Sequence, residues 1–211
     1  MNISKFDYNS FYHIYNRSIG NELLFRFEKD YEYFLDKMKR FLSPSADIIA
    51  YCLIPNHFHL LIKIKELEDL PAGVRHWEDL PDGRKSKSID QALKNFFNSY
   101  TRSYNIAYNR HGRLFQHGYK FKEIRTEEYL MWLIYYIHRN PLHHHLSFKC
   151  ENWLFSSYKD IINNNMSSSK FIFELFGGKD EFIELTSSLN LEYNKINLSY
   201  RYSKDNLEFV K

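Results

Sequence analysis

The sequence predicts an α+β fold in which helices pack on one antiparallel sheet. Its 211 residues fit one domain with appendages. The spacing of apolar residues alternates between strand and helix periods, which predicts elements in the order β-α-β-β-α-β-α. The second and third strands are separated only by Pro55-Asn56, so they should pair as a hairpin. This order is close to the split βαβ sandwich of a ferredoxin-like fold.

The first part of the chain supplies three strands and one helix. Tyr8 to Arg17 is rich in aromatic and β-branched residues and precedes a turn signal, which predicts a strand. Glu28 to Leu42 has apolar residues at i, i+3 and i+4 spacing and is predicted to be an amphipathic helix. Strands are predicted over Asp47 to Leu53 and within Ile54 to Ile64, because both stretches are apolar and bounded by turn residues.

The second part begins with a polar stretch, Glu66 to Ser88, that contains proline and glycine. We interpret it as an insertion that could be mobile or functional. A long amphipathic helix is predicted from Ile89 to Arg110 and an extended segment from Arg113 to Arg125. Thr126 should cap a further helix, and Asn140-Pro141 should end it, because a residue before proline disfavours the helical conformation.

The pattern changes after residue 150, which predicts a main domain over residues 1–150, with the insertion at 66–88, and a helical C-terminal extension over 151–211. Short helices are expected over Trp153 to Ile162 and Asp180 to Leu189. Asn190 to Lys211 is polar and is predicted to be a tail.

Composition narrows the class of protein. Lys and Arg number 29 against 26 acidic residues, and a net charge of +3 is too small to identify a nucleic-acid partner by itself. The two cysteines are not in a metal-binding spacing, which favours a reducing, cytoplasmic location. No signal peptide or long apolar segment is present, so we expect a soluble protein with no membrane partner.

Two histidines stand together in the third strand. Phe58, Leu60 and Ile62 alternate toward a core, and the strand period of two then puts His57 and His59 on the opposite face. Two imidazoles at this spacing can share a metal ion on a rigid support. The plain alternative is a pair of ordinary histidines at a strand end.

A second candidate cluster lies on the helix after Thr126. At about 100° per residue, Tyr136 and Asn140 fall on one stripe beside the core face, whereas Tyr135 points away. A tyrosine phenol attacks a phosphodiester only when a metal or cation withdraws charge from the phosphate. An imidazole pair with a side-chain amide leaves positions open for phosphate oxygens, and Mg²⁺ or Mn²⁺ suits that set. Alternatively, Tyr136 is only a tyrosine at the edge of the core.

Residues 102–125 are basic and aromatic, which is typical of a surface that binds single-stranded nucleic acid. The alternative is a solvated face whose aromatic residues are buried. The predicted nucleic-acid contacts are Arg102, Arg110, Arg113, Lys120, Lys122 and Arg125.

Three motifs resemble those of the single-tyrosine HUH transposases, most closely the REP-associated tyrosine transposases of bacteria. They are Ile54-Pro55-Asn56-His57-Phe58-His59, Tyr136-Ile137-His138-Arg139-Asn140-Pro141 and Trp153-Leu154-Phe155-Ser156-Ser157-Tyr158. The resemblance spans roughly residues 8–158. It implies a ferredoxin-like transposase domain over residues 1–150.

The resemblance also implies an enzyme and its site. His57 and His59 would bind Mg²⁺ or Mn²⁺, Asn140 would take the place of a third polar ligand, and Tyr136 would be the nucleophile. This endonuclease and strand transferase would cut single-stranded DNA beside a hairpin, leaving a 5′-phosphotyrosine and a free 3′-hydroxyl. It would act in the cytoplasm, near the nucleoid, as a monomer or a homodimer.

Other functions remain open. A catalytically silent hairpin DNA-binding protein would keep the surface without the cleavage. A zinc-dependent hydrolase using His57 and His59 would need a further strong ligand and a catalytic carboxylate. An RNA-binding module on the same fold is disfavoured because the RNP-type aromatic motif is absent.

Overall fold

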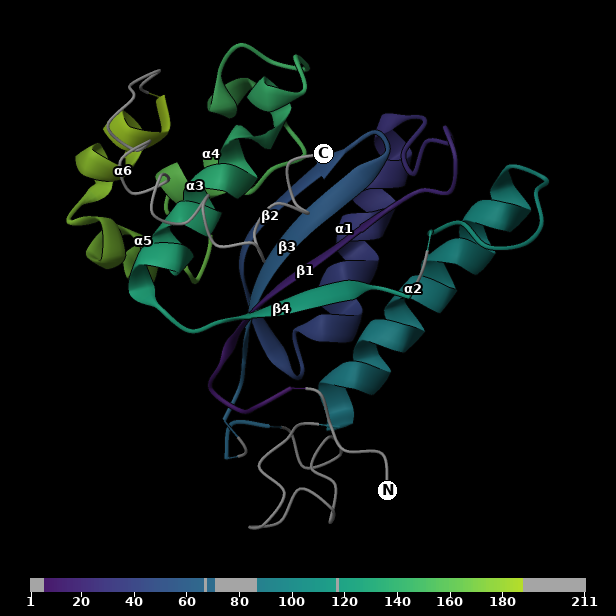
Figure 1. The fold of residues 1–211 in the computed structure, drawn as a ribbon, viewed down its shortest axis with the longest axis horizontal. Coiled ribbons are helices and arrows are strands. Elements are labelled where there is room, and N and C mark those ends of the chain that lie inside the picture. The colour runs from purple at the N-terminus through teal and green to yellow at the C-terminus, as the bar shows by residue number, and fades with distance from the viewer. Residues whose placement is uncertain (1–5, 67, 71–86, 117, 188–211) are drawn as a thin grey trace, which may run out of the picture. The chain divides into compact units, whose positions relative to one another are not determined.

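The computed structural model describes residues 6–66, 68–70, 87–116 and 118–187. The chain divides into two compact units, Met1–Ile124 and Arg125–Lys211 (Figure 1). We call them the sheet unit and the helical unit and describe each by itself. Most of the predicted insertion and all of the predicted tail lie outside the described residues.

The sheet unit confirms the predicted α+β fold. Its four strands pair in the order β2-β3-β1-β4, and every pair is antiparallel. With two helices between them, this is the split βαβ sandwich of a ferredoxin-like fold. The elements are β1 (Phe11–Arg17), α1 (Glu28–Leu42), β2 (Ala46–Ile54), β3 (His57–Ile64), α2 (Lys87–Ala107) and β4 (Lys120–Ile124).

Helices α1 and α2 cover one face of this sheet (Figure 1). The Phe58 ring of β3 lies 5.2 Å from the Phe34 ring of α1 and 5.6 Å from the Phe97 ring of α2, measured between centroids. Leu60 and Ile62 share that face and are buried. The apolar alternation of β3 therefore forms the core, and the histidines take the other face, as predicted.

The hairpin between β2 and β3 is also as predicted. Ile54 pairs with His57 across the Pro55-Asn56 turn. The turn is held from outside, because the Asn56 carbonyl accepts a hydrogen bond from the Ser18 N–H at 2.9 Å and the Pro55 carbonyl accepts one from the Leu24 N–H at 2.7 Å. These bonds fix the position at which the histidine strand begins.

The helical unit is built on α3 (Glu127–His143). Its N-terminus is as predicted: the Thr126 hydroxyl accepts a hydrogen bond from the Tyr129 N–H at 3.2 Å. The unit also holds η2 (Cys150–Asn152), α4 (Tyr158–Ile162), α5 (Ser169–Phe176) and α6 (Lys179–Ser187). No helix among the described residues is long and apolar enough to cross a membrane.

The prediction that Asn140-Pro141 ends this helix is wrong, since α3 continues to His143. Proline costs the helix only the one hydrogen bond that its missing N–H would have donated to the Ile137 carbonyl, and the backbone after it keeps its own bonds. The Asn140 carbonyl still accepts from the His144 N–H at 3.1 Å, and the Pro141 carbonyl accepts from the Leu146 N–H at 2.8 Å. Asn140 is consequently a full helical residue.

The helix predicted over Trp153 to Ile162 is wrong in its first half, because α4 begins only at Tyr158. Serine side chains compete with the helix there: the Ser156 hydroxyl accepts from the Tyr158 N–H at 3.2 Å. The predicted domain boundary at residue 150 lies inside the helical unit, where α3 packs against η2 and α6. A division of function at that residue stays a prediction.

Candidate functional site

The sheet face opposite α1 and α2 carries both predicted metal ligands. In the strand register, His57 lies opposite Arg17 of β1 and His59 lies opposite Tyr15. Since side chains opposite one another in a sheet share a face, these four side chains lie together. We call this surface the histidine face.

Strand β4 brings two of the predicted DNA contacts to the same face. Lys120 pairs with Tyr15, and Lys122 pairs with His13, the next residue of β1 on that face. The Lys120 ammonium lies 5.9 Å from the centroid of the Tyr15 ring. Strand pairing therefore places cations beside imidazoles that lie more than 60 positions away in the sequence.

His59 has a defined hydrogen-bond partner. Its Nδ1 lies 3.0 Å from Nε2 of His13, and both rings are buried. The two imidazoles stack with centroids 5.1 Å apart and planes inclined by 22°. Burial, with a smaller contribution from the positive charge of Lys122, lowers the pKa of His13 to about 3. His13 is therefore neutral near pH 7.

His57 is half-buried and is held by its own neighbour in the turn. Its Nδ1 lies 2.8 Å from the amide oxygen of Asn56. The His57 and His59 rings are 5.3 Å apart between centroids and perpendicular. Two imidazoles this close can bind one ion together.

Four polar or aromatic neighbours of the histidine pair were not predicted: His13, Tyr15, Arg17 and Asn56. A signal was available, because the first three alternate along β1 at the strand period of two. Whether they lie on the same face as His57 and His59 depends on the pairing register of the two strands. The pattern of one strand does not specify that register.

Helix α3 carries Tyr136 on the predicted stripe. The Tyr136 ring stacks on Trp132 at 5.2 Å and 12°, and Trp132 stacks on Tyr129 at 5.4 Å and 14°. Tyr136 is half-exposed at the end of this series. The stacked rings restrict the Tyr136 side chain.

Asn140 follows one turn later on the same helix. It is fully buried, and neither its amide oxygen nor its amide nitrogen has a hydrogen-bond partner within the part of the chain that the structure describes. An unsatisfied buried amide costs about 1–3 kcal/mol. An amide oxygen left in this state fits the role of a ligand for a hard cation such as Mg²⁺ or Mn²⁺.

No three His, Cys, Asp or Glu side chains come together as metal ligands among residues 6–66, 68–70, 87–116 and 118–187. The histidine pair supplies two imidazoles, and any complete set must add ligands of another kind, such as an amide oxygen, water or phosphate oxygens. A structural zinc site, by comparison, is closed by four protein ligands.

Tyr135 is placed differently from Tyr136. The Arg139 guanidinium lies 5.2 Å above the Tyr135 ring, and Arg139 in turn donates to the Thr186 carbonyl at 3.0 Å. Burial raises the pKa of the Tyr135 phenol. Tyr135 is thus half-buried beside Arg139 of the same helix.

The third motif of the sequence ties the helical unit together. Ser157 Oγ lies 2.8 Å from Nε2 of the fully buried His138, and the Tyr158 hydroxyl lies 3.0 Å from that of Thr186 on α6. The first contact joins α3 to the start of α4, and the second joins α4 to α6. These motif residues act in packing, which the sequence alone did not show.

Burial lowers the pKa of His138 to about 3. An unfolded chain takes up a proton here below its usual pKa of about 6.5, and the folded chain does not, so stability falls as the pH drops from about 6.5 toward 3. Between pH 7 and pH 5, we expect the unfolding free energy of the wild type to fall by about 2 kcal/mol more than that of His138→Gln. Urea unfolding at both values measures this, and equal losses in the two proteins would contradict it.

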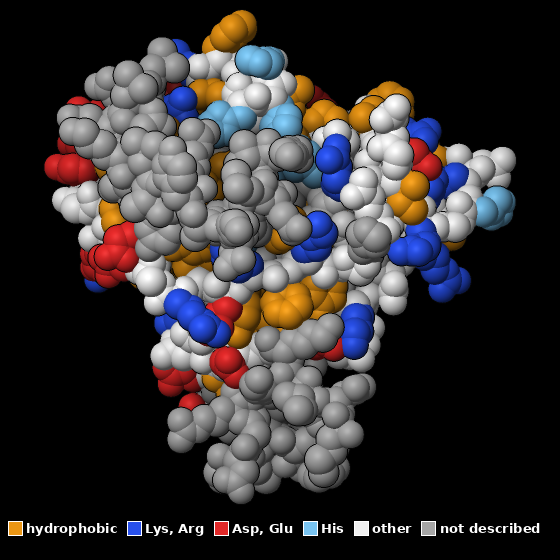
Figure 2. Space-filling model, in the orientation of Figure 1, with side chains coloured by type: hydrophobic (Ala, Val, Ile, Leu, Met, Phe, Trp, Pro, Cys, Tyr) orange, Lys and Arg blue, Asp and Glu red, His pale blue; other side chains and the backbone are white. Residues whose placement is uncertain are grey.

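The other predicted DNA contacts are dispersed. Arg102 and Arg113 are exposed in the sheet unit, and Arg125 is exposed in the helical unit. Arg110 is half-buried, and its guanidinium binds Glu22 at 2.9 Å and Asn105 at 2.6 Å. Figure 2 shows Lys and Arg side chains gathered at the end of α2 and the loop after it, at the right of the view.

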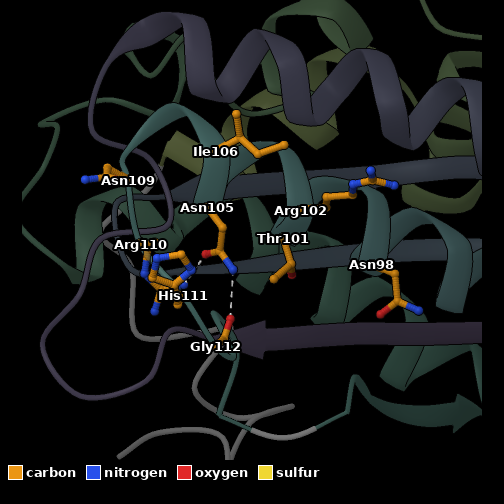
Figure 3. Close-up of a pocket in the computed structure, with 9 residues that line it drawn as sticks. All are labelled: Asn98, Thr101, Arg102, Asn105, Ile106, Asn109, Arg110, His111 and Gly112. Carbon is orange, nitrogen blue, oxygen red and sulfur yellow. Dashed lines mark hydrogen bonds between the residues drawn. The ribbon is translucent and has the colours of Figure 1, made fainter.

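A hollow of about 620 Å³, lined mostly by residues of polar types, lies along this end of α2. Figure 3 shows Asn98 and Arg102 extending from the helix, with Arg110 and His111 of the following loop beside Asn105. Amide and guanidinium groups of this kind can donate to phosphate oxygens.

Three of the aromatic residues in the basic segment or just before it do not form a stacking surface. Tyr100, Tyr104 and Phe115 are buried in the core. The Tyr100 and Tyr104 hydroxyls donate to the Leu24 and Leu23 carbonyls at 2.7 and 2.6 Å. For these rings the alternative of buried aromatics is correct, because helix α2 must cover the sheet with its apolar side.

The sheet unit therefore brings together His57, His59, Lys120 and Lys122, and the helical unit holds Tyr136 and Asn140 one turn apart. No family model and no curated protein matches the sequence. Among solved structures, the chain is similar to a REP-associated tyrosine transposase bound to a REP hairpin, with a TM-score of 0.57 and 13% identity over 76% of this chain and 84% of that chain. At this identity the likeness establishes a shared fold.

Proposed function

We propose that this protein is a metal-dependent endonuclease and strand transferase for single-stranded DNA, of the transposase kind, with hairpin DNA as its substrate. The observation that carries the proposal is the histidine pair on the sheet face opposite α1 and α2, in a fold that is shared with a transposase bound to a REP hairpin. A cytoplasmic, nucleoid-associated location accords with such a substrate.

His57, His59 and Asn140 would hold Mg²⁺ or Mn²⁺ in this proposal. The cation would withdraw charge from the phosphodiester that is cut. The two imidazoles are 5.3 Å apart between centroids, and the Asn140 amide is buried with no hydrogen-bond partner among the described residues, so both fit such a role. The chain itself supplies no third strong ligand from the described His, Cys, Asp and Glu residues.

Tyr136 would be the nucleophile. Its phenol oxygen forms a bond to phosphorus, the bond from phosphorus to the 3′-oxygen breaks, and the phenol proton passes to a base while the 3′-oxygen gains a proton. The products are a 5′-phosphotyrosine and a free 3′-hydroxyl. Rejoining reverses these steps with another 3′-hydroxyl, so the phosphotyrosine bond conserves the energy of the cut.

The cations of the histidine face would bind the DNA backbone. Lys120 and Lys122 flank Tyr15 and His13 on that face, and Arg17 lies opposite His57. Lysine and arginine bind phosphate oxygens and orient the strand without reading its sequence. Arg102 and the hollow at the end of α2 would bind a more distant part of the strand.

The test is a covalent-adduct gel. Labelled single-stranded DNA containing a hairpin is mixed with the protein and Mn²⁺, denatured in detergent and separated by mass. We expect label at the mass of the protein, and we expect EDTA to abolish it. A native gel of the same mixtures measures binding without cleavage.

The outcomes separate the candidate functions. An adduct that depends on Mn²⁺ supports the endonuclease. A shift on the native gel without an adduct, across a panel of hairpins, would replace the proposal with a hairpin DNA-binding protein. Cleavage with zinc and no adduct would favour a hydrolase that uses the histidine pair.

A further inference from the structure

We propose that His13 and Asn56 are positioning residues that each bind Nδ1 of one predicted metal ligand and so make Nε2 the metal-binding nitrogen of both. The inference rests on the metal site of the proposed function and adds two residues to it. Neither would touch the ion or the DNA.

The evidence at His59 is its contact with β1. Nδ1 of His59 lies 3.0 Å from Nε2 of His13, within the range of an ordinary hydrogen bond. The pairing register places His13 diagonally across from His59, opposite Leu61, so the contact is set by the sheet. Both imidazoles are buried, with exposed fractions of 1% and 5%. Water therefore competes little for this bond.

The evidence at His57 comes from the turn. Nδ1 of His57 lies 2.8 Å from the Asn56 amide oxygen, which can only accept. His57 must therefore carry its proton on Nδ1 when this bond forms. The Asn56 backbone is itself held by the hydrogen bond from Ser18, so the acceptor is fixed.

A hydrogen bond donated from Nδ1 of His59 as well would give His57 and His59 the same tautomer. A neutral imidazole has one N–H and one lone pair, and the partner of the first nitrogen decides where the lone pair stands. If His59 donates from Nδ1 to His13, then both His57 and His59 present Nε2 lone pairs. Metal-binding histidines almost always donate their second nitrogen to an outer partner in this way.

Long-range ¹H–¹⁵N NMR of the metal-free full-length chain, at a pH where the histidines are neutral, tests the tautomers directly. We expect Nδ1–H for both His57 and His59 in the wild type. His13→Leu removes the acceptor and should shift His59 toward Nε2–H, whereas His13→Gln keeps an acceptor near the same place and should retain Nδ1–H. Asn56→Ala and Asn56→Asp form the matching pair for His57.

Calorimetric titration with Mn²⁺ supplies the second readout. Loss of an outer partner costs about 10–100-fold in metal affinity, so we expect that loss in His13→Leu and Asn56→Ala, and recovery to within about threefold in His13→Gln and Asn56→Asp. His138→Gln, which alters a buried histidine of the helical unit, should keep the wild-type affinity. It shows how far a general loss of stability affects the titration.

Two results would overturn the inference: an Nε2–H form of either ligand in the metal-free wild type, or unchanged Mn²⁺ affinity in both His13→Leu and Asn56→Ala. Should His13→Leu fail to fold, the Asn56 pair decides, because Asn56 lies in a half-buried turn. A wild type with both Nδ1–H tautomers that binds no Mn²⁺ or Mg²⁺ would refute the metal site of the proposed function and leave the tautomer assignment standing.

Discussion

Replacing Tyr136 with phenylalanine is expected to abolish the covalent protein–DNA adduct. The change removes one oxygen atom, the proposed nucleophile, and leaves the ring that stacks on Trp132 at 5.2 Å. Loss of a nucleophile commonly lowers the rate by about 10³-fold or more. We therefore expect no adduct within the sensitivity of the gel and unchanged binding of the hairpin on a native gel.

Tyr135→Phe is the matched control. Tyr135 is the adjacent tyrosine on the same helix, but it packs under Arg139, and burial raises the pKa of its phenol. We expect this variant to form the adduct at a rate close to that of the wild type. An adduct that persists in Tyr136→Phe and disappears in Tyr135→Phe would exclude Tyr136 as the nucleophile, and mass spectrometry of the DNA-linked peptide would identify the residue used.

Replacing Asn140 with aspartate is expected to make the stability of the protein depend on a divalent cation. Asn140 is fully buried and its amide has no hydrogen-bond partner among the described residues. A carboxylate in its place would be a buried charge, and leaving such a charge unpaired costs about 3 kcal/mol or more. We expect that loss of unfolding free energy in EDTA near pH 7.

Addition of Mn²⁺ should reverse the loss if Asn140 occupies a ligand position. A carboxylate binds a hard cation more strongly than an amide does, so the affinity for Mn²⁺ should rise by about tenfold. Binding to the folded state alone then stabilises it by about 2.7 kcal/mol at 100 times the dissociation constant. Urea unfolding with EDTA and with Mn²⁺ measures both quantities.

Asn140→Leu is the control for this variant. It replaces an unsatisfied amide with an apolar group of similar size, so we expect equal or greater stability in EDTA and weaker binding of Mn²⁺. If Asn140→Asp loses stability and Mn²⁺ restores none of it, Asn140 is not a ligand. The proposed metal site would then need a different third group.

Local patterns in the sequence determined the elements of the fold. The spacing of Tyr31, Phe34 and Met38 predicts α1, and the alternation through Phe58, Leu60 and Ile62 predicts β3 and the face that its histidines occupy. These predictions succeed because burial of one face follows directly from the period of the backbone. The position of Tyr136 on the stripe beside the core face of α3 follows from the same rule.

Patterns of composition were less decisive. The aromatic residues near Arg102 and Arg110 suggested a stacking surface, yet Tyr100, Tyr104 and Phe115 are buried in the core. Aromatic residues serve both purposes, and only the packing of α2 on the sheet separates them. Pro141 likewise predicts a helix end from local sterics, but it costs α3 one hydrogen bond, and the backbone bonds around it keep the helix going to His143.

What the sequence determined by itself was the order of elements, the face of each and the type of side chain at each position. The tertiary structure decided which of these side chains meet. His13 reaches His59 because β1 pairs with β3 in one particular register, and Lys122 joins them because β4 adds to the other edge of β1. Pairing between strands far apart in the chain depends on the whole sheet, and a register shift of one residue would turn every one of these groups to the other face.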